Sequence, residues 1–186
     1  QISTSGSQSD GIAALSFGGS SGAGGNGVFG RPGGADQARP SAPVTINVTG
    51  DITTTGANSS GIDAQSVAGR GGNSAPSFWG FSADAGSAGM GGMVDVTNGA
   101  NITTTGDQST AITAASIGGG GGIGGAGFGL FWAEGGTGGI GGDGGNLSVN
   151  NSCALRTSGS DAAGIFAESI GGNGGSGGTA GGFVSF

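Results

Sequence analysis

The chain lacks histidine, lysine and tyrosine altogether, and these absences exclude several classes of function. Without an imidazole there is no Ser-His-Asp triad, no histidine-ligated zinc and no histidine general base. The total of Lys and Arg is 4, all arginine, which is too few for the basic stripe that nucleic acids require. We therefore expect no nucleic-acid partner. No apolar run approaches 18 residues, so the sequence predicts no membrane-spanning helix.

Charge and large apolar side chains are also scarce. Only 8% of the residues are charged, with a formal net charge of −7, so the high charge typical of disordered chains is missing. Glycine provides 51 of the 186 residues, but without the strict period of three that collagen needs. Cys153 is the only cysteine and can form no internal disulfide. A chain with so few large apolar residues can still fold by stacking them in register with their own copies.

Internal repetition is what the chain has in abundance. The segment Ile2–Gly6 returns at 52–56, 102–106 and 155–159, in steps of 50, 50 and 53 residues. A second block, Gly11–Phe17, returns at 61–67, 111–117 and 164–170. A third precedes the first, at 44–48, 94–96 and 147–149. Three blocks that return at one spacing indicate a repeat architecture.

Each block is typical of a short β-strand, because apolar and polar residues alternate with period two. Three such strands in about 24 residues suit one coil of a solenoid whose strands add in parallel to those of the next coil. We therefore predict an all-β fold, a parallel β-solenoid (β-helix) with repeats of about 50 residues. The predicted core ladders contain Ile52, Ile102 and Leu155; Ile62, Ile112 and Ile165; Val67, Ile117 and Ile170; and Val96 and Val149. We interpret the row of Ser16, Ser66, Ser116 and Ser169 as a hydroxyl ladder inside the coil.

We expect residues 1–186 to form a single repeat array that is a fragment of a longer chain. Its predicted repeats are 1–43 (a partial coil plus a glycine arm), 44–92, 93–145 and 146–186 (truncated).

Each coil leads into a glycine-rich arm. In the third and fourth arms the order Gly-Gly-X recurs with period three, as in Gly135–Asn146 and Gly171–Thr179. This period matches polyproline-II geometry, in which strands have no internal hydrogen bonds and can bond laterally. We predict that the arms stack on one another; the alternative is a set of flexible linkers.

Aromatic residues lie in the middle of each arm, near its expected turn. They are either a second small core that fixes the arms together or an exposed surface that contacts another molecule. The candidate contact residues are Phe29, Phe78, Trp79, Phe81, Phe128, Phe131, Trp132 and Phe183.

Chemical motifs are weak. Gly138–Asp143 matches the start of a calcium-binding nonapeptide, but Gly145 stands where a large apolar residue is required, and tandem copies are missing. We expect no cofactor, with calcium near Asp143 as the alternative. The carboxylates that a glycan-active β-helix enzyme would need, Asp51, Asp63, Asp95 and Asp107, fall on separate coils. We expect no enzymatic activity and no catalytic residues.

A further alternative is an ice-binding solenoid. Thr53 with Thr55 and Thr103 with Thr105 would form a flat array of threonines on the outside of stacked coils. The first and last coils carry serine and arginine there instead, so this array is only two rows deep. Ordinary β-propensity of exposed threonine also explains it.

The blocks Gly61–Val67 and Gly164–Gly175 resemble the repeats of large, glycine-rich autotransporter passenger domains of Gram-negative bacteria. The resemblance covers essentially the whole chain and extends to the Thr-rich strand before each block. It implies a cell-surface or secreted location and an adhesive, aggregating, biofilm-forming or fibre-forming role, without catalysis. Host or abiotic surfaces, or glycans, would be the partners. In that family export uses a C-terminal outer-membrane barrel that these residues do not include. Separately, the unpaired strand edges of both terminal coils predict self-association by end-to-end stacking.

Overall fold

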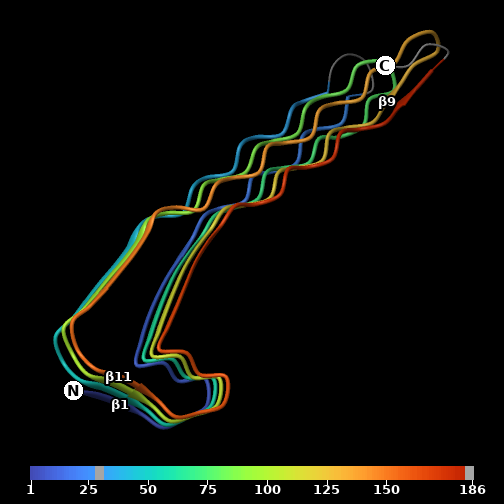
Figure 1. Ribbon diagram of the computed structural model, residues 1–186. Coiled ribbons are helices and arrows are strands. Elements are labelled where there is room, and N and C mark those ends of the chain that lie inside the picture. Colours follow the sequence, from blue (N-terminus) through green and yellow to red (C-terminus); the bar gives the residue numbers. More distant parts are fainter. Residues whose placement is uncertain (28–31, 183–186) are drawn as a thin grey trace.

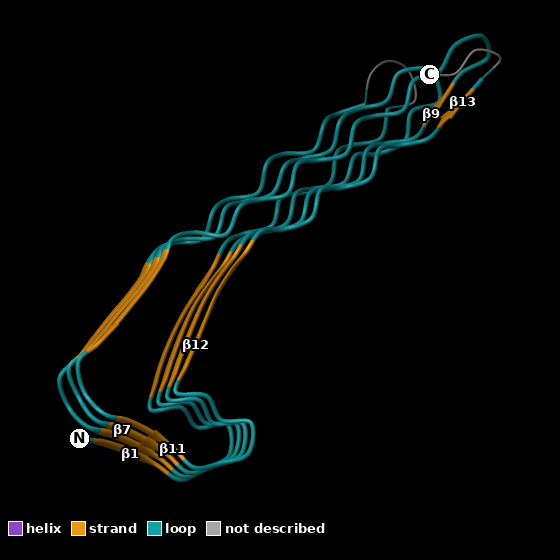
Figure 2. Ribbon diagram, viewed as in Figure 1, coloured by secondary structure: helices purple, strands orange, loops and turns teal. Residues whose placement is uncertain are grey.

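The computed structural model describes residues 1–27 and 32–182, which form strands, turns and extended segments without any helix (Figure 1). Stacked strands lie at one end of the molecule, and long paired extended segments project from them (Figure 2). The strands pair in parallel, with partners about 50 residues apart in sequence. The predicted parallel β-solenoid is therefore confirmed.

Three sheets form the wall of the solenoid. The first contains β1 (Ile2–Thr4), β4 (Ile52–Thr54), β7 (Ile102–Thr104) and β11 (Leu155–Thr157), in that order. The second contains β2 (Ile12–Phe17), β5 (Ile62–Val67), β8 (Ile112–Ile117) and β12 (Ile165–Ile170), and the third β3 (Val44–Val48), β6 (Val94–Asn98) and β10 (Leu147–Asn151). A two-stranded pair, β9 (Gly127–Phe128) and β13 (Ala180–Gly181), lies far out on the arms. Equivalent repeat positions pair with each other, as Ile62 does with Ile112 and Ala64 with Ala114.

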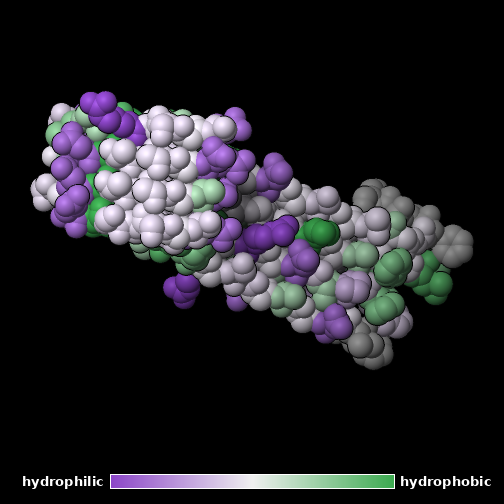
Figure 3. Space-filling model, turned by 90° about the horizontal axis from the view of Figure 1, so that it is seen from below, coloured by the Kyte–Doolittle hydropathy of each residue, from purple (hydrophilic) through white to green (hydrophobic). Residues whose placement is uncertain are grey.

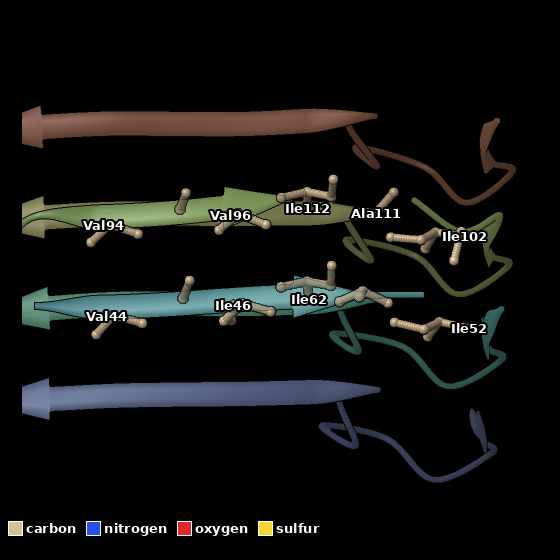
Figure 4. Packing of buried hydrophobic residues seen from close by; sticks show 13 residues of the cluster. Val44, Ile46, Ile52, Ile62, Val94, Val96, Ile102, Ala111 and Ile112 are labelled. Carbon is tan, nitrogen blue, oxygen red and sulfur yellow. The ribbon is translucent and has the colours of Figure 1, made fainter. Parts of the chain in front are cut away.

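The core runs through the middle coils, where inward residues meet their own copies (Figure 4). Ile62, Val94, Ile102 and Ile112 are completely buried, and Ile52 nearly so. The same ladders open towards the chain ends, because no further coil covers them there. Ile165, for example, is 44% exposed.

Hydroxyl groups line the inner corners of the coil. Ser66 and Ser116 are buried, and their Oγ atoms donate hydrogen bonds of 2.9 and 2.8 Å to the carbonyls of Ala42 and Gly92. The predicted inner serine ladder is therefore confirmed. Because the hydroxyls of Ser66 and Ser116 both have a backbone partner, the narrow interior of the coil holds these polar groups without leaving them unsatisfied.

One predicted core ladder is wrong. Phe17, Val67, Ile117 and Ile170 stack in register, but on the outer face of the second sheet. Phe17 is 70% exposed, and Ile170 is exposed as well. The reason is strand parity: β5 turns Ile62, Ala64 and Ser66 inward, so Val67 must point outward. The row is an apolar stripe on the surface.

Each arm consists of an outgoing segment and a returning segment. The outgoing segments are residues 18–27, 68–77, 118–127 and 171–180, and the returning segments are 32–43, 81–92 and 134–145. One residue in three donates its N–H to the next coil, as Gly71, Ser74 and Ser77 do to the carbonyls of Gly120, Ile123 and Ala126. The arms are therefore stacked and hydrogen-bonded, as predicted, and are not independent linkers.

A second residue in three bonds across the arm, between outgoing and returning segments. Gly122 N–H donates to Gly86, and Gly139 N–H donates to Gly122, at 3.1 and 2.9 Å. Gly122 has no room for a side chain, because a Cβ there would lie 1.9 Å from the carbonyl oxygen of Gly72. The third position, X, points outward, as Ile123 and Ile140 do, which are 52% and 73% exposed. This arrangement explains the Gly-Gly-X period, because two positions in three face another backbone.

Ser82 is the exception among the buried hydroxyls. Its Oγ is the buried side-chain atom of the described residues that has no hydrogen-bond partner, and the equivalent position of the next coil is Gly135. We expect Ser82→Ala to stabilise the protein by about 1 kcal/mol, since it removes an unsatisfied buried hydroxyl. Thermal unfolding would measure this, with Ser87→Ala, at an outward X position, as the control. A loss of stability in Ser82→Ala would mean that the hydroxyl has a partner.

Candidate functional site

The outer ends of the second and third arms form the candidate contact surface. Here the outgoing segment ends at Ser77 and Gly127, which pair with each other, and the chain turns back into the returning segment. Gly80 makes this turn with a φ of 97°, a value that favours glycine. A Cβ on Gly80 would also lie 2.9 Å from the carbonyl oxygen of Trp132. The turn of the second arm is thus packed directly against that of the third.

Aromatic rings from the two turns pack in pairs. Phe78 stacks on Phe128 with 6.1 Å between ring centroids, and Phe81 meets Trp132 edge to face at 4.4 Å. Both are geometries that aromatic rings prefer, each worth about 0.5–1.5 kcal/mol. The pairs therefore join the second arm to the third.

The same rings remain accessible to solvent. Phe78, Trp79, Phe81, Phe128, Phe131 and Trp132 are all exposed, and Phe131 reaches 75%. Hydrophobic residues gather at this end of the molecule, away from the solenoid (Figure 3). The aromatic residues of the arms thus match both interpretations in part: the rings fix the second arm to the third, and they also form an exposed apolar surface. Phe29 and Phe183 lie outside the described residues.

Leu130 belongs to this surface, although the sequence singles out only its aromatic neighbours. Its side chain is 68% exposed, next to Phe131. Its place inside the run Phe128–Trp132 is the signal that could have found it. We call Phe78, Trp79, Phe81, Phe128, Leu130, Phe131 and Trp132 the arm tip.

The carboxylates of the solenoid are separate from the arm tip and act as turn and strand residues. Asp51 Oδ1 accepts the N–H of Asn101 at 3.0 Å, and Asp107 Oδ1 accepts that of Ser160 at 2.8 Å. Each thus bonds to the next coil of the stack.

Asp63 lies on the outer face of β5, where Gln65 Nε2 donates to its carboxylate at 2.9 Å. Partial burial raises the pKa of Asp63; the hydrogen bond from Gln65 acts in the opposite direction, and the charge of Asp10 adds to the rise. The Asp63 carboxylate is therefore held by the Gln65 side chain, and Asp10 is the charged residue that acts on it.

Asp143 occupies an outward X position of the third returning segment and is exposed. Across residues 1–27 and 32–182, no three His, Cys, Asp or Glu side chains gather where they could hold a metal ion.

The threonines Thr53 and Thr103 stack in register, flanked by Ser3 and Arg156. This gives the two-row array described by the sequence.

Comparison of the chain with family models, with curated proteins and with solved structures gave no match. In the described part of the chain, no helix has the length and apolar character needed to cross a membrane.

Proposed function

We propose that this chain is an extracellular structural and adhesive module of a bacterial surface protein, and that the arm tip is its contact surface. The supporting observation is the cluster of seven exposed apolar side chains at the far end of hydrogen-bonded arms. Contiguous apolar surface of this kind is typical of interaction sites. The bacterial and extracellular assignments depend on the resemblance of the repeats to autotransporter passengers.

The arms favour this role because they hold the tip at a distance from the solenoid without large side chains. Every third backbone N–H bonds to the next coil and another third bonds across the arm. An exposed aromatic ring held on such a support loses little conformational freedom when it binds, and this reduces the cost of association. The hydrogen-bonded arms thus act as a rigid spacer, and the arm tip is its apolar end.

The partner that fits best is an apolar or amphipathic surface, or the apolar face of a sugar. Tip residues offer ring faces and edges, and Glu134 is the nearest charged residue in sequence. With a net charge of −7, the protein as a whole repels anionic surfaces. Adhesion would therefore rely on apolar contact and would be weakened little by salt.

We expect Phe131→Ser to reduce adsorption of the protein to a hydrophobic surface several-fold, since it removes the most exposed ring of the arm tip. Adsorption would be followed with a quartz-crystal microbalance. Phe17→Ser is the matched control, because Phe17 is 70% exposed but lies on the second sheet. Equal losses in the two variants would contradict a specific role for the tip. Acrylamide quenching of Trp79 and Trp132 in the native protein would show independently that the tip is reached by small molecules.

A further inference from the structure

We propose that the stacked outgoing segments carry a binding site for the carboxylate of an acidic sugar, formed around Arg70 in the second coil. The site lies on the side of the arms and is separate from the arm tip, so the inference does not depend on the proposed function. It starts from a groove that crosses the outgoing segments of neighbouring coils.

The groove has a volume of about 370 Å³ and crosses the first three coils of the stack. Outward residues recur at every third position of an outgoing segment, about 9 Å apart in polyproline-II geometry, and they form its two walls. The backbone between them forms its floor. The residues that line the groove include Ser20, Ser21, Arg70, Asn73, Gly121 and Ile123. Its volume is within the range of small-molecule sites.

Arg70 is the one charged residue among the described residues that line the groove. It is exposed, and none of the described carboxylates forms an ion pair with it. Its guanidinium group can therefore bind a carboxylate through two parallel hydrogen bonds. The net charge of −7 does not prevent this, since at physiological salt charges more than about 8 Å away are largely screened.

Gly120 leaves space beside this guanidinium group. It occupies the outward position that Ser20, Arg70 and Asn173 occupy in the other coils. A Cβ on Gly120 would have no atom closer than 3.7 Å, the distance to both Arg70 Nε and the carbonyl oxygen of Asn173. No backbone contact therefore requires glycine here, in contrast to Gly122. Its lack of a side chain opens the groove on the third-coil side of Arg70.

The hydroxyl and amide groups near Arg70 suit a sugar, because the many hydroxyls of a sugar need hydrogen-bond partners. Asn73 Oδ1 accepts the N–H of Ile123 at 2.8 Å, which holds the side chain in place and leaves its NH2 group as a donor. Ser20 Oγ accepts the N–H of Arg70 at 3.3 Å and can donate its own proton. Ile123 is 52% exposed and offers an apolar contact to the carbon face of a sugar ring. A saccharide that bears a carboxylate, such as a uronate, matches this combination of groups.

Isothermal titration calorimetry of the whole chain with trigalacturonate tests the proposal. We expect the wild type to bind it, and the binding to weaken as salt is added, because the ion pair is exposed. Arg70→Gln should weaken binding by at least about tenfold, since a charged hydrogen-bond donor is lost. Arg156→Gln is the matched control: it removes the same charge, but Arg156 lies on the first sheet of the solenoid, so this variant should bind like the wild type.

A second pair of variants changes the position beside Arg70. Gly120→Asp supplies a carboxylate to Arg70 from within the chain, and it should weaken binding more than Gly120→Asn, which has the same size without the charge. Both variants should keep the thermal stability of the wild type, because a Cβ has room at this position. Equal binding by the two variants would mean that Arg70 does not pair with a carboxylate, and would overturn the proposal.

A wild type that does not bind trigalacturonate would overturn the proposal as well, and so would equal binding of its methyl ester, which lacks the charges. Equal losses in Arg70→Gln and Arg156→Gln would reduce the effect to net charge and contradict a site. Phe131→Ser should bind trigalacturonate normally. Binding that is lost in Phe131→Ser instead would place the sugar at the arm tip, and would overturn the groove site while leaving the adhesive function intact.

Discussion

Gly122→Val should destabilise the protein by at least about 3 kcal/mol, although it replaces the smallest residue of an extended segment with an apolar one. A Cβ on Gly122 would lie 1.9 Å from the carbonyl oxygen of Gly72 and 2.5 Å from its carbonyl carbon. Both contacts are with backbone, so no side chain can rotate away. The second and third arms would have to separate, and the hydrogen bonds between Gly122 and its neighbours Gly86 and Gly139 would be lost.

The chain offers a matched control for this prediction. Gly22 occupies the same position of the repeat in the first coil, where a Cβ would have no neighbouring atom within 4 Å. Denaturant unfolding, measured at a concentration at which both variants are monomeric, should find Gly22→Val close to the wild type. If Gly122→Val were equally stable, the arms could not be packed backbone to backbone.

Ile112→Ala should cost about 2–5 kcal/mol, because the Ile112 side chain is completely buried between Ile62 and Ile165 of the adjacent strands. Removing it leaves a cavity that the flanking coils cannot close without shifting their strands. Thermal or denaturant unfolding of the monomer would measure the loss.

Ile117→Ala is its control within the same strand. Ile117 has the same side chain and likewise stacks on its own repeat equivalents, but it points outward from β8 and is only half-buried. We expect its substitution to cost less than about 1 kcal/mol. If the two variants lost equal stability, the assignment of inner and outer faces in the second sheet would be wrong.

Most of the solenoid was predictable from the sequence, because the signal is repeated. Ile52, Ile102 and Leu155 return at one spacing, and repetition alone fixes their register. What repetition does not fix is which face a row occupies. Val67 recurs as regularly as Ile62, but it lies an odd number of residues further along the strand, which places the two on opposite faces. Counting parity along the strand, rather than apolar character, would have assigned Val67 correctly.

The arms were predictable in kind but not in detail. The Gly-Gly-X period indicates polyproline-II strands that pack laterally. It does not show which glycine of each pair packs against the returning segment and which packs against the preceding coil. That distinction separates Gly121, whose Cβ would meet the returning segment at Gly139, from Gly122, whose Cβ would meet the preceding coil at Gly72. The exposure of the arm tip also needed the structure, because a run such as Phe128–Trp132 suits a core and a surface equally well.

Amide hydrogen exchange of the third arm tests the central claim, that the glycine arms are an ordered, hydrogen-bonded stack. In residues 118–127, the N–H groups of Gly118, Gly119, Gly121, Gly122, Gly124 and Gly125 all donate to backbone carbonyls of other segments. We predict that peptides covering this stretch exchange about as slowly as those covering β8 (112–117). The N–H of the outward residue Ile123 is also bonded, to Asn73 Oδ1, so the residual fast exchange should come from the outward positions Gly120 and Ala126. Exchange of the whole arm at the rate of an unfolded glycine-rich chain, with β8 still protected, would contradict the account.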